Sequence, residues 1–77
     1  MSSADAEAQG AQKLVRMANQ IATFFATQPG QTQAADVAGH LKAFWEPRML
    51  LRLYAHVDEG GEGLHPLARE AVARLRG

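Results

Sequence analysis

The chain has 77 residues, with eight basic and eight acidic side chains and no cysteine. This length suits a single domain, and the balanced charge argues against a nucleic-acid-binding module, which normally carries a basic excess. Without cysteine there is no disulfide bond and no thiolate metal site. No apolar run approaches the roughly 20 residues of a membrane span, and the N-terminus lacks the features of a secretory signal. We therefore expect a cytoplasmic protein.

The first ten residues, MSSADAEAQG, are small and polar, so we expect a flexible tail over residues 1–10 and a single helical domain over residues 11–77. Residues 11–28 have the spacing of a helix with one apolar face. That face carries Leu14, Met17, Ala18, Ile21, Phe24 and Phe25. The sequence QPGQ at 28–31 should end this helix, because proline removes a hydrogen-bond donor and glycine tolerates the turn.

A second helix is expected from about Thr32, which is a plausible N-cap, up to the sequence FWEPRM at residues 44–49. Its apolar stripe comprises Ala34, Val37, Ala38, Leu41, Phe44 and Trp45. Pro47 suits the first position of a third helix over about residues 47–57, and it pushes Glu46 out of the helical conformation. The sequence therefore predicts a sharp corner between the two helices.

The third predicted helix is apolar over more than half of its circumference, and an apolar arc this wide usually contacts two different surfaces. The arc comprises Met49, Leu50, Leu51, Leu53, Tyr54 and Val57, and the polar strip comprises Arg48, Arg52 and His56. An acidic, flexible loop is expected at DEGGEG, residues 58–63. Pro66 then opens a fourth helix, with His65 as a poor N-cap. No strand-like alternation occurs, so we predict an all-α fold, a small bundle of about four short helices.

The sequence contains no recognisable catalytic or metal-binding constellation. The three histidines, His40, His56 and His65, lie in different segments without the spacing of metal ligands. The loop at residues 58–63 lacks the alternating acids of a calcium-binding loop and the signature of a phosphate-binding loop. We therefore expect no catalytic, cofactor-binding or metal-binding residue in this chain.

The corner at residues 44–49 is a candidate partner interface, because tryptophan and arginine are the side chains most enriched at binding hot spots. The alternative for Arg48 and Arg52 is a solvated polar strip. Phe24, Phe25 and Phe44 fit the core by their spacing, although Phe44 also belongs to the corner. The predicted interface comprises Phe44, Trp45, Pro47, Arg48, Met49 and Arg52.

Three stretches resemble the delta subunit of cytoplasmic NAD-dependent formate dehydrogenase. They are RMANQIATFF at 16–25, HLKAFWEPRM at 40–49 and GLHPLAREAV at 63–72, and the likeness covers roughly Leu14 to Leu75. Some positions depart from the pattern of the family. Glu46 stands where the family often has aspartate, Leu50 stands where many members have a basic or polar residue, and His65 replaces a better N-cap.

The resemblance implies a non-catalytic accessory subunit that stabilises, or helps to assemble, a complex that oxidises formate to carbon dioxide and reduces NAD. It implies docking on the alpha subunit, which holds a bis-molybdopterin guanine dinucleotide site with molybdenum or tungsten and iron–sulfur clusters. Beta and gamma subunits would carry FMN and further clusters. One alternative is a transient, chaperone-like factor for metal-cofactor insertion into the alpha subunit. Another is a small helical DNA-binding regulator, which the scattering of arginines among acids disfavours.

Overall fold

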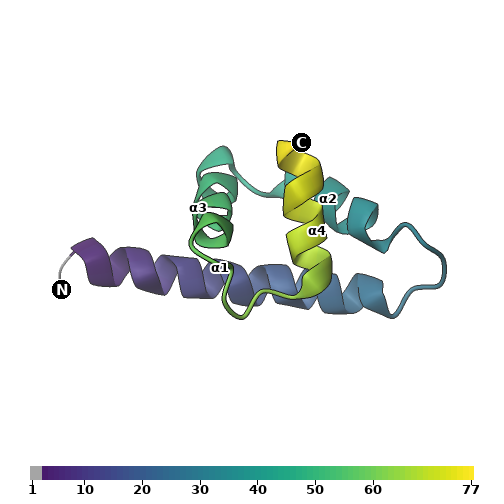
Figure 1. The fold of residues 1–77 in the computed structure, drawn as a ribbon, viewed down its shortest axis with the longest axis horizontal. Helices are drawn as coiled ribbons and strands as arrows, with labels where there is room; N and C mark the ends of the chain where they lie inside the picture. The colour runs from purple at the N-terminus through teal and green to yellow at the C-terminus, as the bar shows by residue number, and fades with distance from the viewer. Residues whose placement is uncertain (1–2) are drawn as a thin grey trace.

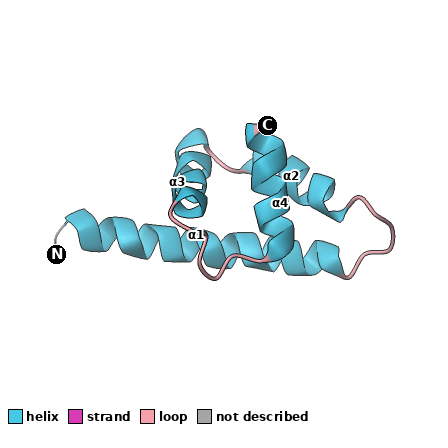
Figure 2. Cartoon of the chain, in the orientation of Figure 1, coloured by secondary structure: helices cyan, strands magenta, loops and turns pink. Residues whose placement is uncertain are grey.

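The computed structural model describes residues 3–77, with side chains from residue 10 onward. It contains helices α1 (Ser3–Ala26), α2 (Gln33–Phe44), α3 (Pro47–Asp58) and α4 (Pro66–Arg76). No strand occurs within this described range (Figure 2). The predicted all-α fold of four helices is confirmed.

The first helix begins much earlier than its apolar spacing predicts. α1 starts at Ser3, so the segment expected to be a tail is helical almost throughout, while residues 1 and 2 lie outside the described residues. Residues 3–10 include three alanines, one glutamate and one glutamine, which are strong helix formers, so the lack of large apolar residues there does not end the helix. At the other end, Thr27 N–H and Gln28 N–H donate to the Phe24 and Phe25 carbonyls before the chain turns.

The long helix α1 supports the other three helices, which pack along one of its sides (Figure 1). α4 contacts α2 most extensively, and both also contact α1. The first turns of α1 extend beyond α3, which gives the molecule its elongated outline of 44 × 22 × 21 Å.

The core lies where α1, α2 and α4 meet, and α3 contributes Leu53 to it. Alanines of α1 and α4 are completely buried, which lets the backbones of these helices approach closely to the others. The largest fully buried side chains are those of Leu41, Leu53, Val37 and Val72. The buried cluster comprises Leu14, Val15, Ala18, Ala22, Val37, Ala38, Leu41, Trp45, Leu53, Leu64, Ala68, Ala71 and Val72.

The corner between α2 and α3 has the predicted backbone but not the predicted burial. Pro47 is the first residue of α3, and Glu46 is extended with φ −70° and ψ 152°. α2 ends at Phe44, and the extended backbone of Trp45 (φ −90°, ψ 140°) breaks the helical periodicity at this point. Trp45 is only 7% exposed, whereas Phe44 is 73% exposed, so the expectation that Phe44 belongs to the core is wrong.

The loop between α3 and α4 was expected to be flexible, but hydrogen bonds hold it to three helices. His56 Nε2 of α3 donates to the Glu62 carbonyl at 2.8 Å. The Arg69 guanidinium of α4 donates to the Gly60 and Gly61 carbonyls, each at 2.8 Å. Gly60 and Gly61 have φ values of 116° and 64°, a region that favours glycine, so the loop needs these residues to present its carbonyls.

Asn19 of α1 joins this loop to the start of α4. Its amide donates to the Gly63 carbonyl at 2.9 Å, and its Oδ1 accepts from the His65 N–H at 2.8 Å. His65 is in turn an effective N-cap, contrary to expectation, because its Nδ1 accepts from the Leu67 N–H at 3.0 Å. Asn19 therefore fixes the position of the α4 N-terminus against α1.

Asn19→Ala is expected to lower the free energy of unfolding by about 1–3 kcal/mol, because it leaves a part-buried N–H and a carbonyl without their partners. Urea-induced unfolding followed by circular dichroism measures this loss. Gln20→Ala, at the next and exposed position of α1, is the control. Equal effects of the two substitutions would show that the Asn19 hydrogen bonds do not stabilise the fold.

Candidate functional site

The predicted interface residues do not form one continuous patch. Trp45 is buried in the core, and Pro47 is exposed at the corner. Phe44 lies on the exposed side of α2, where its ring is 4.7 Å from that of His40. The remaining three residues, Arg48, Met49 and Arg52, line a groove between α3 and α1. The structure thus divides the predicted interface between two surfaces.

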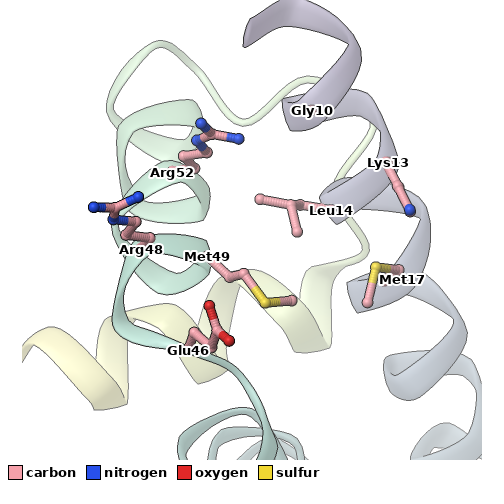
Figure 3. Close-up of a pocket in the computed structure, with 8 residues that line it drawn as sticks. All are labelled: Gly10, Lys13, Leu14, Met17, Glu46, Arg48, Met49 and Arg52. Carbon is pink, nitrogen blue, oxygen red and sulfur yellow. The ribbon is translucent and has the colours of Figure 1, made fainter. Parts of the chain in front are cut away.

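The first surface is the groove between α1 and α3, called the basic groove below (Figure 3). It has a volume of about 380 Å³. The side chains of Leu14, Met17 and Met49 project into the space between the two helices and form its apolar floor. The residues that line it are Gly10, Lys13, Leu14, Met17, Glu46, Arg48, Met49 and Arg52.

Gly10 gives the basic groove its shape at the end nearest the N-terminus of the chain. We expected this glycine to mark the end of a tail, but it lies within α1, beside Arg52. A Cβ atom at position 10 would lie 3.0 Å from Nη1 of Arg52. The absence of a side chain therefore lets the guanidinium approach α1, which could not be recognised from the sequence because Gly10 and Arg52 are far apart in it.

The second surface consists of four aromatic rings and one isoleucine on α1 and α2, and it is called the aromatic surface below. It comprises Ile21, Phe24, Phe25, His40 and Phe44. The rings of Phe24 and Phe25 pack edge to face at 5.1 Å, and Phe25 lies 6.4 Å from His40. Ile21, Phe24, Phe25 and His40 also line a shallow hollow of about 260 Å³. Phe24 is 59% exposed, so its expected place in the core is wrong.

One feature of the sequence could have revealed the aromatic surface. Successive residues of an α-helix point about 100° apart, so Phe24 and Phe25 point in different directions, and Phe25 is partly buried while Phe24 is exposed. The remaining apolar area of the two phenylalanines is left at the surface.

Three acidic side chains lie in neither surface. Asp58, Glu59 and Glu62 lie at the end of α3 and in the loop that follows. Arg76 pairs with Asp58 at 2.7 Å and lies over the ring of Tyr54, 5.3 Å from its centroid. The hydrogen bond from Arg76 lowers the pKa of Asp58 below its ordinary value. Arg76 and Arg69 are thus engaged within the fold.

No reactive centre emerges from the described part of the chain. Among the side chains described, those of residues 10–77, no group of three or more histidine, cysteine, aspartate or glutamate residues is placed to hold a metal ion. Within residues 3–77, no helix has both the length and the apolar character needed to cross a membrane. A third hollow, of about 560 Å³, lies between α1 and the loop that follows α3, and its lining includes Arg16, Glu59 and Glu62.

Comparison with known proteins identifies the family. Residues 13–72 match the family model of the NADH-dependent formate dehydrogenase delta subunit, FdsD. No curated protein and no solved structure matches the chain significantly. The matched range includes Asn19, the corner at Pro47, the aromatic surface and most of the basic groove, and it confirms the resemblance found in the sequence. The chain belongs to the family of NADH-dependent formate dehydrogenase delta subunits.

Proposed function

We propose that this chain is a non-catalytic accessory subunit that stabilises a cytoplasmic formate dehydrogenase complex, or assists its assembly, by docking on the large alpha subunit. The complex would oxidise formate to carbon dioxide, reduce NAD and contain beta and gamma subunits as well. The bis-molybdopterin guanine dinucleotide with molybdenum or tungsten, the iron–sulfur clusters and FMN would then belong to the other subunits. Membership of the delta-subunit family supports the choice of complex.

The aromatic surface is the observation that supports a docking role. Small proteins usually bury phenylalanine, yet Phe24 and Phe44 are 59% and 73% exposed here. They lie beside the partly buried Phe25 and Ile21, so the exposed apolar area is concentrated in one place. Concentrated apolar area of this kind marks surfaces that bind other proteins.

The sequence-predicted interface can be assigned roles within this proposal. Phe44 would contact the alpha subunit through the aromatic surface, and Arg48, Met49 and Arg52 would contact it through the basic groove. Trp45 and Pro47 would act from within the chain, because Trp45 packs in the core beneath the corner and Pro47 begins α3. Both surfaces flank this corner, so a single large partner could cover them together.

Replacing Phe24 and Phe44 by alanine together is expected to weaken binding to the alpha subunit at least about tenfold, because exposed aromatic anchors dominate binding energy at interfaces. The measurement is the affinity of the tagged chain for formate dehydrogenase that lacks its delta subunit. The control is Thr23→Ala with Lys42→Ala, which changes exposed residues of the same two helices. Equal affinities of the two double variants would exclude the aromatic surface as the docking site.

Co-purification of the tagged wild-type chain from its native host tests the proposed function itself. Recovery of a large iron–sulfur subunit with formate-dependent NAD reduction would support it, and recovery of the chain alone would contradict it. Equal amounts of both subunits in the mature enzyme would indicate a resident subunit. Recovery only with the metal-free alpha subunit would instead indicate a transient, chaperone-like factor.

A further inference from the structure

We propose that the basic groove binds an acidic segment of the alpha subunit that also carries apolar side chains. This inference rests on the proposed function and adds the chemistry of the partner at one of its two surfaces. Three observations support it: the charges that line the groove, its apolar floor, and the engagement of arginines outside the groove in hydrogen bonds or an ion pair within the chain.

The groove has a local excess of positive charge in a chain whose formal net charge is zero. Among the described side chains that line it, Lys13, Arg48 and Arg52 are cationic and only Glu46 is anionic. Arg48 and Arg52 project from successive turns of α3; Arg52 extends toward α1, while Arg48 and Lys13 lie at the outer edges of the groove on α3 and α1 (Figure 3). This arrangement provides cations on both helices for a carboxylate-bearing segment placed between them.

The fold uses its other arginines differently. Arg69 holds loop carbonyls, and Arg76 pairs with Asp58. By contrast, none of the three cations of the groove forms an ion pair or a hydrogen bond with a side chain described from residue 10 onward. The acids at residues 58–63 could have neutralised these cations but lie in the loop that Arg69 and Asn19 hold elsewhere. Charge complementarity therefore favours an acidic partner.

The floor of the groove favours a peptide segment over a small anion. Leu14, Met17 and Met49 lie between the two helices, and the two methionines are only half-buried. Methionine is flexible and polarisable, and it is well suited to receiving apolar side chains of different shapes. A small anion would use the cations and leave this apolar area exposed, whereas a segment with both acidic and apolar side chains would cover it.

The distribution of lysines makes a direct test possible. The chain has only two lysines, Lys13 in the groove and Lys42 on α2, outside the groove. A carbodiimide couples a carboxylate to an amine only where the two are in contact. Treatment of the assembled complex, followed by mass spectrometry, should link Lys13 to an aspartate or glutamate of the alpha subunit at least about tenfold more often than Lys42.

Charge reversal provides the second test. Arg48→Glu with Arg52→Glu should weaken binding to delta-free formate dehydrogenase at least about tenfold. Arg16→Glu with Arg74→Glu makes the same change in total charge at exposed positions outside the groove, and it should have little effect. Wild-type affinity should fall as salt rises from about 0.1 M to about 1 M, since the Debye length shortens from about 10 Å to about 3 Å. The Arg48/Arg52 variant should lose most of this dependence on salt.

The outcomes separate this inference from the proposed function. If the wild-type chain binds the alpha subunit and the two charge-reversed variants bind equally, the inference that an acidic segment occupies the groove is wrong. The proposed function would then still stand. Linkage of Lys13 to Asp58, Glu59 or Glu62 of a second copy would overturn the inference as well, because the occupant would then be this chain. If the wild-type chain does not bind the alpha subunit at all, the proposed function fails and the inference fails with it.

Discussion

Trp45→Ala is expected to lower the free energy of unfolding by about 3–5 kcal/mol, whereas Phe44→Ala should lower it by about 1 kcal/mol or less. Trp45 is 7% exposed and belongs to the core cluster, while Phe44 is 73% exposed and contacts the His40 ring. A domain has about 0.05–0.15 kcal/mol of stability per residue. For 77 residues this is about 4–12 kcal/mol, so the tryptophan substitution should remove a large share of the stability of the chain.

Urea-induced unfolding followed by far-ultraviolet circular dichroism compares the two variants, because Trp45 is the only tryptophan and its fluorescence disappears with the substitution. Similar losses of stability would show that both aromatic side chains pack in the core, and the description of the corner would then be incorrect. The pair also separates folding from docking. Phe44→Ala should weaken binding to the alpha subunit while the chain stays folded, and Trp45→Ala should weaken binding only to the extent that it unfolds the chain.

The corner illustrates what could be predicted from local sequence. The restriction that Pro47 places on Glu46 and the suitability of proline for the first helical position act within a few residues. They are therefore visible without knowledge of the fold, and the structure confirms them. The buried positions Ala34, Val37, Ala38 and Leu41 of α2 follow from helical spacing in the same way.

Which side chains at the corner are buried depends on packing between helices. The spacing of apolar residues in the sequence does not reveal this packing. Trp45 and Phe44 are adjacent in sequence, but α2 ends between them and only Trp45 enters the core. Likewise, Arg48 and Phe44 belong to one short motif, yet they lie on different surfaces because α3 starts in a new direction. The six residues of FWEPRM are contiguous in sequence, but they do not form one contiguous surface in the structure.

The interactions that organise the rest of the candidate site span long distances in sequence. Asn19 bonds to residues near position 65, and Gly10 makes room for Arg52. Neither contact follows a helical period, and a single polar residue or glycine within a helix gives no local indication of its partner. The start of α1 depends on a different property, because strong helix formers extend the helix back to Ser3 although large apolar residues are absent there.

Leu53→Ala is expected to lower the free energy of unfolding by about 2–5 kcal/mol, and Leu51→Ala should change it by less than about 0.5 kcal/mol. The two leucines make a matched pair, since both lie within α3 and undergo the same chemical change. Leu53 is 1% exposed and fully enclosed by the core, whereas Leu51 is 63% exposed. The same urea-induced unfolding experiment measures both variants.

The comparison also tests why α3 has such a wide apolar arc. One part of the arc, with Leu53 at its centre, packs on the core, and the partly buried Met49, Leu50, Tyr54 and Val57 border it. Leu51 lies outside that part, so its apolar area does not stabilise the isolated chain. If Leu51→Ala proved as destabilising as Leu53→Ala, α3 would be buried on both sides within the chain, and no apolar face of this helix would remain for a partner.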